Sequence, residues 1–120
     1  ADLDGDTELQ VELNREGVPI VVHAHGDNIK LIKKWVPKLR SPVIYTCQSK
    51  PLPGIYNFGG FTDGDRAVMI AEKFEAKKII LNGWDFDNPV SDGSKSKMKK
   101  KKLRWAKKII ERTKQPVKMV

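Results

Sequence analysis

The sequence has one cysteine and two histidines, and these shortages limit the kinds of site that it can build. Cys47 alone cannot form a disulfide within the chain, which favours a reducing, cytoplasmic setting. His23 and His25 are too few for a dinuclear zinc centre, because even a single catalytic zinc usually takes three protein ligands. No apolar run approaches the roughly 18 residues that a membrane-spanning helix needs. We therefore expect neither a disulfide framework nor a membrane as partner.

Acidic residues are missing from one stretch of the chain. Residues 95–108 hold nine cations and no acid, whereas the rest of the sequence has 14 cations and 15 acids. The net charge of +8 therefore comes from a single segment. Such a run is most often the solvated face of a helix. The alternative is attraction of a polyanion, either a triphosphate or nucleic acid. Nucleic acid is the weaker of the two, because aromatic residues are not interleaved with basic ones elsewhere.

Apolar runs alternate with segments of helical periodicity along the sequence. We expect Thr7 to cap the first helix, Gly17 to end it, and Pro37 to kink or end the second. We predict helices at 8–16, 29–39, 62–76 and 97–113. We predict strands at 18–24, 42–48, 55–61, 77–86 and 116–120.

Strands that alternate with helices in this way indicate βαβ units. We predict an α/β fold, a Rossmann-like three-layer domain with a mainly parallel sheet. A length of 120 residues fits one domain, residues 1–120. The sequence begins directly in a loop-like stretch, so we expect a piece of a longer chain that lacks an N-terminal portion.

Four turn-like motifs are rich in glycine and aspartate: DLDGD (2–6), HAHGDN (23–28), NFGGFTDGDR (57–66) and GWDFD (83–87). Each is placed where it would lie at the carboxyl edge of the predicted sheet. In an open parallel sheet, ligands bind outside the carboxyl ends of the strands. We therefore expect the four motifs to converge on one crevice.

The aspartates of the first and last motifs suit a hard cation. Asp2, Asp4 and Asp6 alternate, and clusters of carboxylate oxygens favour Mg²⁺. A calcium loop is excluded, because the glycine comes too early and position twelve is Leu13 rather than glutamate. Asp85 follows the clearest strand, where a carboxylate often binds a metal or a ribose. For each of these aspartates a solvated turn remains open.

The HAHGDN motif resembles the H-x-H-x-D-H signature of metal-dependent hydrolases but ends in Asn28 instead of histidine. A phosphate role fits better, because Gly26 lets the backbone approach a ligand and Asp27 and Asn28 begin a helix. Two alternatives remain open. His23, His25 and Asp27 could together hold one zinc ion, or the histidines are held at a strand end for structural reasons.

The third motif combines glycines, a helix cap, two carboxylates and an arginine within eight residues. Arg66 is suited to bidentate binding of a phosphate. Asp63 and Asp65 either hold a metal or cap the helix that follows.

Taken together, DLDGD, HAHGDN, NFGGFTDGDRA and GWDF closely resemble the archaeal 6-hydroxymethyl-7,8-dihydropterin pyrophosphokinase (MptE-like) family. The catalytic domain of that family is related to thiamin pyrophosphokinase. The resemblance covers nearly the whole chain and implies Mg²⁺-dependent transfer of diphosphate from ATP to a hydroxymethyl pterin, with release of AMP. ATP and the pterin would then be the partners, nucleic acid would not, and a homodimer stays open.

On this resemblance we assign three sets of site residues. The expected catalytic residues are His25, Asp65 and Arg66. The expected cofactor-binding residues are His23, Gly26, Asn28, Gly60, Thr62 and Asp85. The expected metal ligands are Asp2, Asp4, Asp27 and Asp63. Two other functions remain open, a metal-dependent phosphohydrolase and a non-enzymatic nucleotide- or nucleic-acid-binding module that uses residues 95–108.

Overall fold

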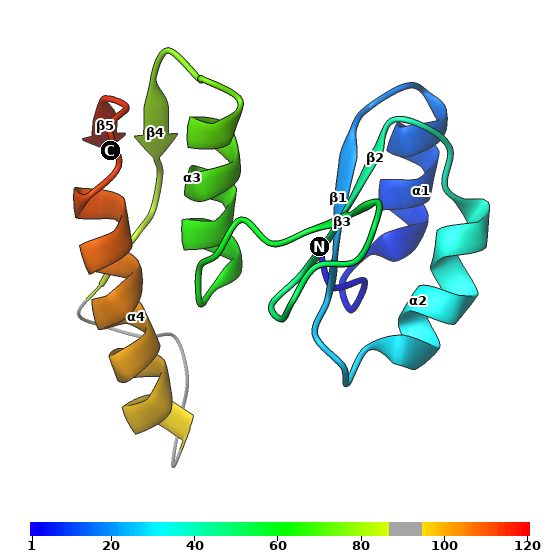
Figure 1. Cartoon of the computed structure of the whole chain (residues 1–120), viewed down its shortest axis with the longest axis horizontal. Helices are drawn as coiled ribbons and strands as arrows, with labels where there is room; N and C mark the ends of the chain where they lie inside the picture. Colours follow the sequence, from blue (N-terminus) through cyan, green and yellow to red (C-terminus); the bar gives the residue numbers. More distant parts are fainter. Residues whose placement is uncertain (87–94) are drawn as a thin grey trace. The chain divides into compact units, whose positions relative to one another are not determined.

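The computed structural model describes residues 1–86 and 95–120, which divide into two compact units. Unit 1 is Ala1–Asn57 and unit 2 is Phe58–Val120, and each has a parallel sheet and a hydrophobic core of its own. Figure 1 shows the helices and strands of both units along the chain. Unit 1 contains α1 (Thr7–Arg15), β1 (Ile20–Ala24), α2 (Ile29–Trp35), the 3-10 turn η1 (Val36–Lys38), β2 (Val43–Cys47) and β3 (Ile55–Tyr56).

The sheet of unit 1 has the order β1-β2-β3, and both pairings are parallel. The backbone of Ala1 extends this ladder beyond β1. Ala1 N donates to the carbonyl of Val21 at 2.7 Å, and His23 N donates to the carbonyl of Ala1 at 2.8 Å. This is the pattern of a parallel pair. The residues after Ala1 therefore leave the ladder at the same edge as the residues after β1.

The first helix begins at Thr7, one residue earlier than predicted. Asp6 is the cap, because its carboxylate accepts from Leu9 N at 3.2 Å. Thr7 is buried, and its hydroxyl donates to the carbonyl of Leu3 at 3.0 Å. The prediction of Thr7 as the cap is wrong, because that hydroxyl is turned into the loop. Gly17 follows the helix with φ of 97°, as expected of a residue that ends one.

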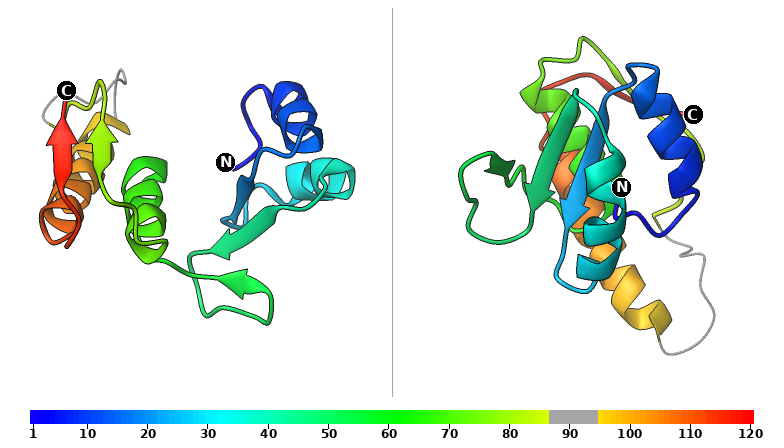
Figure 2. Two further views of the ribbon diagram at one scale, coloured as in Figure 1. Left: turned by 90° about the horizontal axis from the view of Figure 1, so that it is seen from above. Right: turned by 90° about the vertical axis from the view of Figure 1, so that its right-hand side faces the viewer.

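Both helices of unit 1 lie on one side of its sheet (Figures 1 and 2). The core between them is formed by buried Leu3, Val11, Val22 and Trp35. The regular α-helix α2 ends at Trp35, and the chain continues as the 3-10 turn η1. Proline at position 37 explains this change, because it has no backbone N–H to continue an α-helix.

Unit 2 has a two-stranded parallel sheet in which β4 pairs with β5. Its core joins Val68, Ile79, Leu81 and Ile110, so both helices pack on β4. Its elements are α3 (Asp63–Lys73), β4 (Ile79–Leu81), α4 (Lys95–Glu111) and β5 (Val117–Met119).

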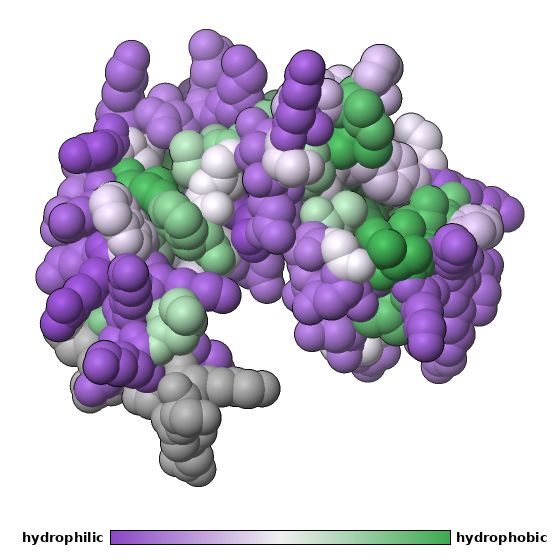
Figure 3. All heavy atoms as spheres, turned by 60° about the horizontal axis from the view of Figure 1, so that its bottom comes forward, coloured by the Kyte–Doolittle hydropathy of each residue, from purple (hydrophilic) through white to green (hydrophobic). Residues whose placement is uncertain are grey.

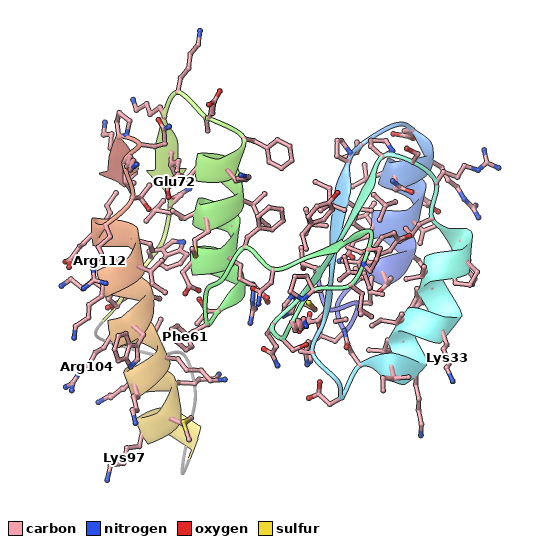
Figure 4. The ribbon with its side chains drawn as sticks, in the orientation of Figure 1. Lys33, Phe61, Glu72, Lys97, Arg104 and Arg112 are labelled. Atoms are coloured by element: carbon pink, nitrogen blue, oxygen red, sulfur yellow. The ribbon has the colours of Figure 1, made fainter. Side chains whose placement is uncertain are left out.

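The outer face of α4 carries most of the basic run. Ala106 and Ile110 are buried, whereas Lys97 and Arg104 project away from α3 (Figure 4). Hydrophilic side chains also predominate on the face of the molecule in Figure 3. The solvated helix expected for residues 95–108 is therefore what the described side chains of this segment show.

The α/β class and the parallel pairing are confirmed. The described strands form two sheets, where the sequence led us to expect one. The third strand is confined to Ile55–Tyr56 and the fourth to Ile79–Leu81. The polar loop expected after residue 86 lies outside the described residues. Within the described part of the chain, no helix is both long and apolar enough to cross a membrane.

One glycine of unit 2 is required by packing. A Cβ atom at Gly64 would lie 1.9 Å from Cζ2 and 2.1 Å from Cη2 of Trp84. We expect Gly64→Ala to displace the indole and lower the free energy of unfolding by about 1–3 kcal/mol. Denaturant titration followed by circular dichroism measures this. Gly5→Ala is the control, because the nearest atom there, Nε2 of Gln10, is 4.0 Å away. Equal stability of the two variants would contradict the packing argument.

Candidate active site

The first group of polar residues lies at the carboxyl end of β1. The motif 23–28 runs off this strand, and the Ala1 pairing brings the acidic residues 2–6 to the same edge. Parallel strands present their carboxyl ends together, so the two motifs become neighbours although some 20 residues separate them.

His25 is the centre of this group. Its Nδ1 is paired with a carboxylate oxygen of Asp27, and its Nε2 lies 3.3 Å from Oδ2 of Asp2. The second contact has the distance of an ion pair without the alignment of a hydrogen bond. The imidazole is a quarter exposed, whereas the Asp27 side chain is 81% exposed. The carboxylate on Nδ1 orients the ring, and Nε2, which has almost no exposed surface, faces Asp2.

Asp2 is held in its charged form. Burial by itself raises the pKa of this carboxyl, but hydrogen bonds with Asp4 and with its own backbone amide, together with the His25 imidazole, lower it by more. The pKa of Asp2 therefore lies below its ordinary value. The contribution of Asp4 to this shift means that the Asp2 and Asp4 side chains lie close to each other.

The Asp2 and Asp4 carboxyl groups fit a magnesium ion better than a zinc ion. Mg²⁺ is usually bound by one or two carboxylates, and the remaining positions are filled by water and substrate phosphates. Among residues 1–86 and 95–120, no group of three or more His, Cys, Asp or Glu side chains is arranged to hold a metal without such outside ligands.

The side chain of Asn28 links the motifs at 2–6 and 23–28 by hydrogen bonds. Its side chain is buried, and Nδ2 donates to the carbonyls of Asp2 at 3.1 Å and His23 at 2.8 Å. Oδ1 accepts from His25 N at 3.2 Å. The structure thus gives Asn28 a structural role, and its predicted binding of a cofactor stays untested. Gly26, in contrast, has φ of 92° and open space where a Cβ would stand.

His23 is the buried histidine of the motif, and it pairs with a residue that the sequence analysis missed. Its Nδ1 lies 2.9 Å from Oγ1 of Thr46, also buried, on the neighbouring strand β2. The His23 ring stacks on His25 with 5.9 Å between the ring centroids. Threonine is common in strands, so nothing in the sequence distinguishes Thr46.

The second group of polar residues is at the start of α3 in unit 2. Thr62 and Asp65 form a capping box, in which each side chain pairs with the backbone of the other residue. The carboxylate of Asp65 accepts from Phe61 N at 2.8 Å, from Thr62 N at 2.6 Å, and from the Thr62 hydroxyl. Asp65 has 0% of its surface exposed, so its first role is to fold this loop.

Gly60, in the loop before α3, packs closely against Arg66 at the start of that helix. Gly60 has φ of 93°, and a Cβ there would lie 2.7 Å from Cγ of Arg66. Arg66 Nη1 lies 3.1 Å from Oδ1 of the exposed Asp63. Asp85 is exposed after β4, whereas Asp87 lies outside the described residues. These places agree with roles for Asp63, Arg66 and Asp85 toward a ligand, and those roles stay predictions.

The predicted site residues thus divide between the two units. Each group is defined within its own unit, and the convergence of all four motifs on one crevice stays a prediction.

Comparison with known proteins decides the family. The family model described as 6-hydroxymethylpterin diphosphokinase MptE-like matches residues 1–91, which is more than half of the chain and includes all four motifs. The chain belongs to the MptE-like family. The resemblance predicted from the motifs is therefore confirmed.

Three curated relatives of this MptE-like chain are named 6-hydroxymethyl-7,8-dihydropterin pyrophosphokinase. Those of Methanocaldococcus jannaschii, Methanothermobacter thermautotrophicus and Pyrococcus furiosus are 47%, 42% and 43% identical to it over 92% of this chain. The chain spans about half the length of these relatives, 52%, 51% and 50%. No solved structure matches it. The helix α4 begins at Lys95 and lies beyond the matched residues 1–91.

The capping role of Asp65 predicts a loss of stability when its charge is removed. In Asp65→Asn an amide nitrogen replaces one acceptor oxygen beside donors that remain buried, so we expect about 1–3 kcal/mol of destabilisation. Urea unfolding of the MptE-like chain measures it. Asp63→Asn is the matched control, because that side chain is 67% exposed and its pair with Arg66 should contribute below about 1 kcal/mol. Equal losses in the two variants would contradict the assignment.

The lowered pKa of Asp2 predicts a stability that depends on acid. Because the folded pKa lies below the unfolded value, the ionised carboxylate stabilises the fold above the unfolded pKa, and this contribution is lost as the pH falls through the folded pKa. We expect the wild type to be more stable than Asp2→Asn at about pH 6, and the difference to shrink toward about pH 2. Urea unfolding at both pH values tests this. A difference that grows in acid would show the opposite sign.

Proposed function

We propose that this chain carries the diphosphate-transfer site of a 6-hydroxymethyl-7,8-dihydropterin pyrophosphokinase that uses ATP and Mg²⁺. The supporting observation is the match of residues 1–91 to the MptE-like family. The contacts of His25 with Asp2 and Asp27 at the end of β1 agree with it. The names of the three relatives agree with this reaction.

The reaction forms one bond to phosphorus and breaks another. The hydroxymethyl oxygen of the pterin attacks the β-phosphorus of ATP, the bond from that phosphorus to the oxygen bridging to the α-phosphorus breaks, and AMP leaves. Such transfers depend on positioning and charge neutralisation more than on covalent catalysis. We assign Asp2 and Asp4 to the magnesium, which when bound would neutralise phosphate charge.

The hydroxyl proton needs an acceptor, and we assign this role to His25. Asp27 holds Nδ1 of the ring, so Nε2 is the atom that takes the proton. Asp27 then stabilises the imidazolium that results. On this assignment Asp27 positions a base and does not need to bind the metal. The sequence analysis, in contrast, expected Asp27 to be a metal ligand. Arg66 is assigned to the charge that develops on the transferred group.

A product assay tests the function. The protein is incubated with ATP, Mg²⁺ and 6-hydroxymethyl-7,8-dihydropterin, and the nucleotides are separated. We expect AMP and pterin diphosphate in equal amounts, and no AMP when the pterin is omitted. ADP or free phosphate formed without the pterin would show a metal-dependent phosphohydrolase instead.

A variant pair tests the base within the same assay. We expect His25→Gln to lower kcat by about 10²- to 10⁴-fold, the usual contribution of general acid–base catalysis. Lys33→Gln is the control, because Lys33 is an exposed residue of α2 that projects from the unit (Figure 4). Unchanged kcat in His25→Gln would remove His25 from this role.

A further inference from the structure

The proposed mechanism makes no use of His23, the buried member of the histidine pair. His23 and Thr46 are register partners in the parallel ladder of β1 and β2, so the sheet itself places their side chains next to each other. Both are almost fully buried, at 3% and 4% exposure. A buried polar pair of this kind needs its hydrogen bonds satisfied, which restricts where the protons are.

The Thr46 hydroxyl makes two contacts but has a single proton. Oγ1 donates to the carbonyl of Val22 at 3.2 Å and lies 2.9 Å from Nδ1 of His23. While the proton is directed to Val22, the oxygen can only accept from the imidazole. Nδ1 must then carry a hydrogen, and in the neutral ring Nε2 is left as the acceptor.

We infer that Thr46 is a positioning residue of the candidate active site, which fixes His23 as its Nδ1–H tautomer and holds the stacked His25 in place. The ring planes of the two histidines differ by 26°. Thr46 holds His23, His23 supports one face of His25, and Asp27 and Asp2 hold the edges of His25. The arrangement also means that neutral His23 presents an acceptor at Nε2 and no donor, which disfavours the phosphate-binding role expected for it.

The tautomer is measured directly by nitrogen NMR of the ring atoms at a pH where His23 is neutral. The chain has two histidines, so the spectrum of His25→Gln assigns the His23 signals. We expect a protonated Nδ1 and an unprotonated Nε2 in the wild type and in Thr46→Ser, which keeps the hydroxyl. Thr46→Val, of similar shape, should lose this preference. A wild-type ring that is protonated on Nε2 would overturn the inference, and that result does not depend on any variant folding.

The catalytic consequence rests on the proposed function and is tested separately. A misplacement of about 1 Å near the reacting groups costs up to about 100-fold in rate. We expect Thr46→Val to lower kcat by about 10- to 100-fold, with the KM for ATP changed less than about threefold, and Thr46→Ser to restore kcat. Equal kcat in Thr46→Val and the wild type would refute the positioning role. If the wild type makes no pterin diphosphate, the proposed function fails, and the NMR result alone then decides on Thr46.

Discussion

The first half of the candidate site depends on one buried amide side chain, that of Asn28. It satisfies two carbonyls and one N–H from three different residues, those of Asp2, His23 and His25. Without it, the buried carbonyl of His23 would lack this partner, at about 1–3 kcal/mol, and the part-buried groups of Asp2 and His25 would lose theirs at a smaller cost. The pairing of Ala1 with β1 and the Asn28 side chain together hold the first motif beside the strand that carries the histidines. The contact between Asp2 and His25 depends on both of these attachments.

The third motif, residues 57–66, also combines a buried structural residue with an exposed one. Asp65 is buried and folds the loop through three hydrogen bonds, and its neighbour Asp63 is exposed beside Arg66. In HAHGDN, Asn28 is buried and its neighbour Asp27 is exposed. In each motif, a buried residue that determines the fold lies within two residues of an exposed carboxylate. A sequence motif of this kind therefore contains residues that determine the fold as well as residues suited to chemistry, and burial distinguishes them.

Much of the fold could be predicted from the sequence, because it depends on local periodicity. The strand at 20–24, for example, is a continuous apolar run rich in β-branched residues. The end of α2 is likewise a local effect, because Pro37 has no backbone N–H to continue the helix. Asp6 and Thr7 are both good caps, and only the turn of Thr7 toward Leu3 decided between them. The role of Thr46 could not be predicted from the sequence, because it depends on the strand register that pairs Thr46 with His23. The division of the strands between two sheets depends on long-range pairing, which periodicity does not specify.

The two units also differ in net charge. Residues 1–57 contain seven acids and seven cations, whereas residues 58–120 contain eight acids and 16 cations. The whole net charge of +8 thus belongs to unit 2, much of it on the outer face of α4. Charge on a solvated face acts over about a Debye length, 8–10 Å, and raises the rate of encounter with anions more than it selects among them. The exposed cations of α4 therefore give unit 2 the net positive charge that attracts anions, whereas the charges of unit 1 balance. Within unit 1, selection among ligands then depends on the carboxylates and His25, whose positions are set by hydrogen bonds and ion pairs.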